Sequence, residues 1–315
     1  METSGCLKRN LNLGSHLSKG RGIYVKRLYS NKMVILSLVL PALLVFLFAI
    51  LAPICLSVYY GFTSYSGMGE AEFIGIENYK NLMKDSTFWL SLRNSLFLAI
   101  GFICIQHPLA MIVAAVLDKL QGKAEGFFRC VYFIPNVISV AVIAYLWKFI
   151  YNPDFGLLNN ILKLFGYQGK INWFSTENAI WSVLVVLIWH GFGWGMLIYY
   201  TGIKNIDPVL YEAAAIDGAS QKTIFFRITL PLMKPVIQVN VTMAVISALK
   251  QMETVYLLTN GGPGNSTQFT ANYLYQQAFK AFNYGYGNAI GVIFIILCLS
   301  VTVFLNKVFA EKEIA

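Results

Sequence analysis

Charged residues are scarce in this sequence. Asp, Glu, Lys and Arg make up 12% of its 315 residues, whereas hydrophobic residues make up 57%. An average soluble domain carries about 25% charged residues, so the composition excludes an ordinary soluble globular protein. The mean hydropathy of +0.60 points the same way. The chain is expected to lie in lipid.

Histidine and cysteine are also few, and neither residue type is clustered. The three histidines, His16, His107 and His190, lie far apart, and the five cysteines show no paired or metal-like spacing. A membrane-bound enzyme needs a nucleophile, a base or a metal set gathered at one place, so we expect no catalytic residue and no metal site. A glycine-rich phosphate-binding loop followed by Lys-Ser or Lys-Thr is missing too, and we expect no ATP site in this chain.

What the sequence does contain is a series of apolar runs of membrane length. A hydrocarbon core about 30 Å thick needs roughly 20 apolar residues per helix. Six runs meet this condition, at 33–58, 95–117, 131–150, 180–203, 236–258 and 289–309. The expected fold is therefore all-α, a polytopic membrane protein with six transmembrane helices.

The basic residues predict how these helices are oriented. With six spans both termini lie on one side, together with the loops around Lys119 and Lys222. That side carries sixteen Lys and Arg residues and the opposite side carries eight. Because loops rich in Lys and Arg stay in the cytoplasm, we expect both termini to be cytoplasmic. The net charge of +9 then reflects topology and contact with anionic membrane lipid, and with no folded basic domain we expect no nucleic-acid partner.

The N-terminal residues differ from the rest of the chain. They are polar and basic and lack the apolar core and cleavage site of a signal peptide. We expect residues 1–32 to form a mobile basic cytoplasmic tail, because they offer too little apolar surface to offset the entropy lost on ordering. The transmembrane domain is expected to occupy residues 33–315.

A short polar segment at 205–235, between the fourth and fifth runs, predicts a helical hairpin. Asp207 can cap a helix that begins at Pro208 and runs to Asp217. Gly218 can close this helix in a left-handed conformation. Ser220 can then cap a second helix that extends to about residue 229. The expected local structure is helix, tight turn, helix.

This hairpin resembles the EAA loop of the membrane-spanning subunits of ATP-binding-cassette (ABC) importers. Glu212, Ala213, Asp217, Gly218 and the Leu230-Pro231 ending match the pattern. In that family the loop sits in a cleft of the cytoplasmic ATPase and transmits its movement to the membrane helices. The residues that the resemblance assigns to ATPase coupling are Glu212, Ala213, Ala214, Asp217, Gly218 and Ala219. The alternative is an ordinary amphipathic surface helix whose glycine only ends it.

The resemblance also implies the partners. They are a second homologous permease, an ABC ATPase dimer and an extracellular solute-binding protein, in a bacterial cell membrane. ATP and Mg would be bound by the ATPase, and no cofactor is expected in this chain.

The solute pathway is predicted from the fourth and fifth runs. The stretch from Trp189 to Gly195 sets a histidine and three glycines between aromatic residues, which suits either a sugar-stacking surface or a tight helix crossing. Residues 257–264 and 284–287 resemble the carbohydrate branch of these permeases, the maltose, lactose, raffinose and glycerol-phosphate type. Positions carried over from that branch as pathway residues are His190, Gly191, Trp194, Ser247 and Gln251, while Leu187, Ala244 and Ala248 replace polar groups there.

Two alternatives stay open at this point. The first is that the same machinery imports a phosphorylated polyol or another solute. The second is a secondary transporter. Such a protein would couple solute transport to an ion gradient through ionisable groups in the membrane, and this sequence has almost none. Gln106-His107-Pro108, inside the second run, either lines a cavity or forms a packing kink.

Overall fold

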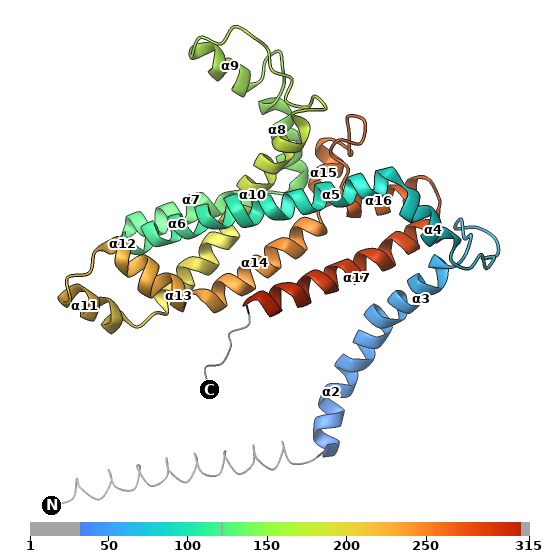
Figure 1. Cartoon of the computed structure of the whole chain (residues 1–315), viewed down its shortest axis with the longest axis horizontal. Coiled ribbons are helices and arrows are strands. Elements are labelled where there is room, and N and C mark those ends of the chain that lie inside the picture. The colour runs from blue at the N-terminus through green and yellow to red at the C-terminus, as the bar shows by residue number, and fades with distance from the viewer. Residues whose placement is uncertain (1–31, 121, 310–315) are drawn as a thin grey trace, which may run out of the picture. The chain divides into compact units, whose positions relative to one another are not determined.

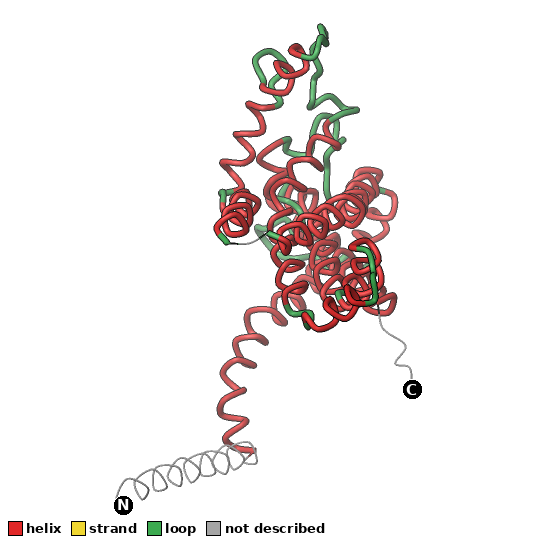
Figure 2. Tube along the Cα trace, turned by 90° about the vertical axis from the view of Figure 1, so that its left-hand side faces the viewer, coloured by secondary structure: helices red, strands yellow, loops and turns green. Residues whose placement is uncertain are grey.

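The computed structural model of the protein describes residues 32–120 and 122–309. Within these ranges the chain forms helices joined by turns and loops (Figure 2). The expected tail at 1–32 lies outside the described residues except for Lys32. The chain divides into two units, Met1–Tyr59 and Tyr60–Ala315.

One apolar helix runs through the first unit and ends at Gly61, two residues past its boundary. It consists of α2 (Lys32–Phe46), the π-helical turn η1 (Leu47–Leu51) and α3 (Ala52–Gly61). The part long and apolar enough to cross a membrane is Ile35–Gly61, with 27 residues. This helix corresponds to the predicted run at 33–58.

The second unit holds the remaining helices. In chain order they are α4 (Glu77–Lys84), α5 (Ser86–Gly101), η2 (Phe102–Gln106), α6 (His107–Lys119), α7 (Lys123–Val137), α8 (Val140–Ile150), α9 (Leu157–Leu164), α10 (Ala179–Lys204), α11 (Pro208–Ile216), α12 (Gln221–Ile224), η3 (Phe225–Thr229), α13 (Leu230–Leu232), α14 (Lys234–Leu249), α15 (Glu253–Leu258), α16 (Thr270–Tyr275), η4 (Gln276–Lys280) and α17 (Tyr284–Phe309).

Three of the predicted runs in this unit are single helices of membrane length. The run at 95–117 lies within the continuous helix Ser86–Lys119, which joins α5, η2 and α6. The runs at 180–203 and 289–309 correspond to α10 and α17, each with 26 residues. These helices were predictable because a long uncharged stretch can satisfy its backbone in lipid only by forming a helix.

The run at 131–150 is not one straight helix, contrary to the expectation. It is divided between α7 and α8, which meet at an angle of 97°. Between them Ile138 is extended and Ser139 is not helical. Pro135 lies inside α7, two residues before its end, where its ring and missing N–H weaken the preceding turn. The bend itself falls after Val137.

The run at 236–258 is also divided. α14 ends at Leu249, and a separate short helix, α15, starts at Glu253. The break falls at Lys250 and Gln251, where Lys250 is exposed. Hydropathy averaged over the window did not resolve these two polar residues, which end the helix.

Three prolines inside helical segments share one local structure. Pro53, Pro108 and Pro231 each follow a π-helical turn by two residues. In each case the N–H of the residue before the proline donates a hydrogen bond to the carbonyl five residues earlier. The pairs are Ala52 to Leu47, His107 to Phe102 and Leu230 to Phe225. A proline ring clashes with the carbonyl four residues earlier and removes a donor. The wider turn accommodates both effects, so the helix continues.

α10 lies at the centre of the second unit. It packs against α6, α7 and α14, while α14 also packs against α5 and α17 (Figure 1). Val183, Val186 and Leu187 of α10 meet Val245 and Ala248 of α14 in a fully apolar core. Towards its C-terminal end, α10 joins a second apolar cluster with α6 and Met233. Any group presented by α10 is therefore held on a rigid scaffold.

Candidate functional site

The hairpin between α10 and α14 is built by local capping. The Asp207 side chain accepts a hydrogen bond from the N–H of Val209 at 3.0 Å and starts α11. Gly218, with φ of +75°, closes the helix. The N–H groups of Gly218 and Ala219 donate to the carbonyls of Ala215 and Ala214 at 3.1 and 2.9 Å, which is the Schellman arrangement.

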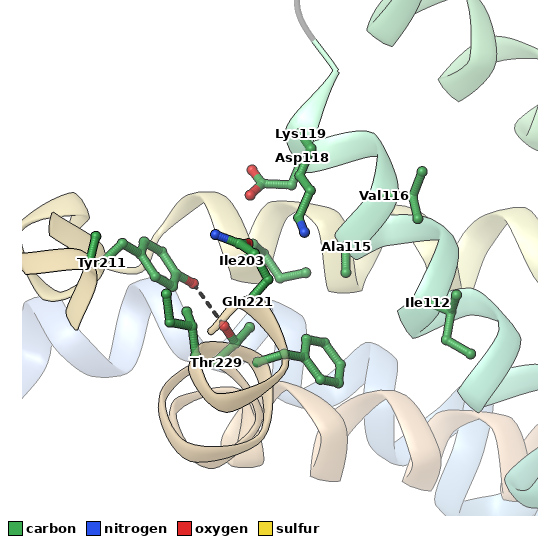
Figure 3. A pocket seen from close by; sticks show the side chains of 12 residues that line it. Ile112, Ala115, Val116, Asp118, Lys119, Ile203, Tyr211, Gln221 and Thr229 are labelled. Carbon is green, nitrogen blue, oxygen red and sulfur yellow. Dashed lines mark hydrogen bonds between the residues drawn. The ribbon is translucent and has the colours of Figure 1, made fainter. Parts of the chain in front are cut away.

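The second helix of the hairpin begins directly after the turn. The Ser220 side chain accepts from the N–H of Thr223 at 3.2 Å and caps α12. The hydroxyl groups of Tyr211 and Thr229 then lie 3.2 Å apart and join the two legs (Figure 3). Because Ala214 and Ile224 are buried, the hairpin has an inner face that is partly closed by its own side chains.

The outer face of α11 is open. Val209, Glu212, Ala213 and Ile216 are spaced at i, i+3, i+4 and i+7, so they share one side of the helix, and all four are exposed. Ile216 is 87% exposed and Val209 is 62% exposed. Glu212 forms no ion pair in the described part of the chain. An exposed apolar strip with one free carboxylate suits contact with another protein.

The other predicted coupling residues are divided between the two faces. Ala214 is buried, and Ala219 is half-buried. Asp217 and Gly218 are exposed at the turn, where a Cβ at Gly218 would meet nothing within 4 Å. The structure thus brings all the predicted residues into one hairpin, but only Glu212 and Ala213 lie on the exposed strip of α11.

A polar network holds the helix ends beside the hairpin. Lys204 of α10 contacts Asp118 of α6 at 2.9 Å. Tyr200, one turn earlier in α10, donates to the Glu125 carboxylate of α7, which also lies 3.7 Å from Arg129. Between this network and the hairpin is a cavity of about 380 Å³, lined by Ile112, Asp118, Ile203, Tyr211 and Gln221 among others (Figure 3).

A second cavity, of about 440 Å³, lies among η2, α6, α7, α10 and α14. It gathers seven of the eight positions proposed for the pathway, namely Leu187, His190, Gly191, Trp194, Ala244, Ser247 and Gln251. The eighth, Ala248, is fully buried in the apolar core instead. Trp194 and Met243 are 55% and 51% exposed, so the cavity is open on their side.

Four further polar residues line this cavity: for two of them, Gln106 and His107, the sequence left a cavity lining and a packing kink open, and the other two were not expected there. They are Gln106, His107, Asn136 and Asn240. Asn136 accepts from the N–H of Trp194 at 3.2 Å, and Asn240 donates to the carbonyl of Gly195 at 3.0 Å. For Asn136 and Asn240 the sequence did carry a signal, because an amide side chain inside an apolar run needs a hydrogen-bond partner or a cavity in lipid.

The lining of the cavity suits a neutral polar solute. Amides, a hydroxyl and imidazoles offer hydrogen bonds, and the Trp194 indole offers a flat apolar surface. None of its lining residues is Lys, Arg, Asp or Glu. Within residues 32–120 and 122–309, no group of three His, Cys, Asp or Glu side chains could hold a metal ion.

Comparison with known proteins gives consistent matches. Residues 106–312 match the sequence profile of the family described as "Binding-protein-dependent transport system inner membrane component". The "Probable ABC transporter permease protein YurN" of Bacillus subtilis (strain 168) is 38% identical over 283 residues, which cover 89% of this chain and 97% of that protein. The "Multiple sugar-binding transport system permease protein MsmF" of Streptococcus mutans serotype c is 32% identical over 265 residues, covering 83% and 90%.

A solved structure is similar as well. A chain in the crystal structure of a bacterial alginate ABC transporter, in complex with an alginate pentasaccharide-bound periplasmic protein, superposes with a TM-score of 0.78 at 23% identity. The match covers 90% of the present chain and 94% of that chain. At this identity the likeness describes the fold.

Proposed function

This chain belongs to the family of binding-protein-dependent transport system inner membrane components, and we propose that it is one permease subunit of an ATP-driven importer of sugars or oligosaccharides. It would supply half of the translocation pore. One observation carries the proposal: α10 and α14, which flank the hairpin, also line the polar cavity. A movement of the hairpin is thereby linked to the cavity walls.

We propose that the hairpin binds a separate ATPase through the strip of Val209, Glu212, Ala213 and Ile216. The exposed apolar side chains would be buried in a cleft of the partner, and the Glu212 carboxylate would meet a basic group there. ATP and Mg would be held by the ATPase. Asp217, Gly218 and Ala219 would act by fixing the turn, and Ala214 by packing the hairpin from within.

Transport follows from two states of the assembly. ATP binding would move the docked hairpin, and the polar network of Lys204 and Asp118 at the ends of α10 and α6 would pass the movement to the helices. The cavity would then face alternately outward and inward. A ligand or nucleotide shifts such an equilibrium only by its differential affinity for the two states, so sugar delivered from outside and ATP bound inside would favour the outward-facing form.

The other components follow from the family and from the open side of the cavity. An extracellular solute-binding protein would deliver the sugar, and an ATPase dimer would supply the energy. A second homologous permease would cover the side on which Trp194 and Met243 are exposed. The assembly would lie in a bacterial cell membrane.

We propose six crossings, with α7 and α8 forming one bent crossing and α14 the fifth. The hairpin and the C-terminus would be cytoplasmic. In support, Leu305 and Phe309 at the end of α17 line the same cavity as Phe225 and Phe226 of the hairpin. The N-terminal tail at 1–32 would lie on the same side because of its basic residues.

A sugar fits the cavity better than a phosphorylated polyol does. A phosphate group is usually held by Lys, Arg or a helix N-terminus, and no basic side chain lines this cavity. A flat indole beside amides matches a sugar, whose ring stacks while its hydroxyl groups form hydrogen bonds. The name of the relative from Streptococcus mutans points to the same solute class.

Uptake in the natural host tests the proposal. The gene is deleted, and uptake of a panel of labelled mono-, di- and oligosaccharides is compared with and without the restored gene. We expect loss of at least one sugar. Trp194→Ala should lower its uptake about two- to tenfold, since a stacking contact is worth about 0.5–1.5 kcal/mol. Unchanged uptake of every sugar, with loss of a non-sugar solute, would contradict the proposal.

Trp181→Ala is the matched control. Trp181 lies on the same helix and is 56% exposed, nearly as much as Trp194. It lines a different, apolar cavity. Uptake in this variant should remain at the wild-type level, so that a fall confined to Trp194→Ala reports on the polar cavity.

A further inference from the structure

Two buried side chains of the polar cavity have unused hydrogen-bonding atoms. Gln106 and His107 are only 5% and 4% exposed. In the described part of the chain, Gln106 Oε1 and His107 Nε2 have no hydrogen-bond partner. An unsatisfied buried polar group costs free energy. Packing alone would favour apolar residues at both positions.

The π-helical turn η2 places Gln106 at the cavity. Pro108 requires the wide turn that ends at Gln106, as described above, and Phe102, where that turn begins, also lines the cavity. The pair Gln106 and Phe102 thus presents an amide and an aromatic ring from the helix that faces α10.

Gly191 of α10 makes room for the amide. A methyl group on Gly191 would lie 3.2 Å from Gln106 Nε2 and 3.5 Å from Oε1. The first distance is shorter than an ordinary van der Waals contact, so any larger residue would press on the amide. Since Gly191 also lines the cavity, the amide sits against the α10 wall.

His107 is held in a fixed orientation. Its Nδ1 atom lies 2.7 Å from the Tyr199 hydroxyl of α10, and the two rings meet edge to face. Nδ1 is thereby used within the protein, and Nε2 is the ring nitrogen left over.

We propose that Gln106 is a solute-binding residue of this permease, contacting hydroxyl groups of the sugar, and that His107 supports it with its free Nε2. An amide both donates and accepts, as a hydroxyl group does, and it carries no charge. The polar wall on the α5–α6 helix would thus face the Trp194 side of the cavity. This inference rests on the proposed function and adds a binding surface from a helix remote in sequence from the hairpin.

Gln106→Met separates binding from packing, because methionine is similar in length but has no strong hydrogen-bonding group. We expect uptake of the transported sugar, at concentrations below saturation, to fall about tenfold, as for loss of a hydrogen bond in a site closed to water. The midpoint temperature of unfolding of the purified protein should stay the same or rise, because an unsatisfied buried oxygen has been removed. A purely structural glutamine would give a fall in both quantities.

Gly191→Ala is the second variant, and it keeps the amide but displaces it. Uptake should fall here too, with the protein still present in the membrane, so the inference can be judged even if Gln106→Met does not accumulate. Gln238→Met is the control. Gln238 lies on α14 outside the cavity, where its amide donates to Asn306 at 3.3 Å, and uptake should not change.

The outcomes are distinct. Wild-type uptake in both Gln106→Met and Gly191→Ala would overturn the inference and leave the proposed function intact. Joint loss of uptake and thermal stability in Gln106→Met, with wild-type uptake in Gly191→Ala, would assign Gln106 to packing. Failure of the wild-type protein to support uptake of any sugar would instead overturn the proposed function.

Discussion

Gly193 of α10 lies so close to Asn136 of α7 that a Cβ atom on the glycine would be 2.7 Å from the asparagine Oδ1. It would also collide with the carbonyl oxygen of Tyr132. The backbones of α7 and α10 therefore touch at this point, as small residues permit in membranes. The contact forms one edge of the polar cavity, which Asn136 lines.

Gly193→Ala should separate these two helices. Because the methyl group meets backbone atoms that cannot rotate away, we expect a loss of about 1–3 kcal/mol in stability. Thermal unfolding of the purified protein measures it. Gly126→Ala in α7 is the control: nothing lies within 4 Å of a Cβ there, and an alanine should stabilise the helix by up to about 1 kcal/mol. Equal effects in the two variants would contradict the close contact.

Gly218→Val should disturb the hairpin through its backbone. The φ of +75° is unfavourable for a β-branched residue by about 1–2 kcal/mol, and no neighbour would be struck. We expect weaker co-purification of the ATPase and less ATP hydrolysis stimulated by the binding protein, with normal membrane insertion. Gly218→Asn should retain most of both, because asparagine tolerates this conformation. Normal coupling in the valine variant would refute the role of the turn.

Labelling of single cysteines checks the orientation. The native cysteines are first replaced, and a cysteine is placed either at Ser220 in the hairpin or at Asn265 in the loop after α15. Since the basic residues predict a cytoplasmic hairpin, an impermeant thiol reagent should label Asn265→Cys in intact cells and leave Ser220→Cys unlabelled until the membrane is opened. The reverse pattern would overturn both the topology and the coupling proposal.

Asp85 should make the protein sensitive to acid. Burial opposes ionisation of its carboxylate, but hydrogen bonds from the Tyr273 and Tyr286 hydroxyls, at 2.5 and 2.6 Å, and from the N–H groups of Phe88 and Thr87 outweigh it and lower the pKa. A group whose pKa is lowered by folding stabilises the protein above its unfolded pKa, about 3.9 for Asp. That contribution is lost as the pH falls through the folded value.

The unfolding midpoint should therefore drop on acidification below about pH 4, and part of that drop should be missing in Asp85→Asn. At neutral pH, Asp85→Asn and Tyr286→Phe should both be less stable than the wild type. The first replaces a charged acceptor by a weaker, neutral one, and the second removes the hydrogen bond between Asp85 and α17. An Asp85→Asn variant with the same acid sensitivity as the wild type would exclude this carboxylate as the cause.

Parts of this architecture were predictable because their causes are local. Asp207, Gly218 and Ser220 act on backbone groups within five residues of themselves. The first helix of the hairpin begins and ends, and the second begins, where these residues indicate, whereas helical structure continues beyond the expected end near residue 229 to Leu232. Pro135 shows what the local sequence could not predict. A proline can stand in the first turn of a helix or near its end, and the sequence around Pro135 does not distinguish the two; the structure places it two residues before the end of α7.

The sequence by itself determined that this chain is an all-helical membrane protein with a capped polar hairpin, since hydropathy over about 20 residues and capping chemistry decide those features without distant contacts. The tertiary structure alone decided that α7 and α8 bend, that Ala248 is core, and that Gln106 stands opposite Gly191. Which faces of two helices meet depends on the steric fit of side chains far apart in the chain. The polar cavity forms only because several such helix contacts occur together.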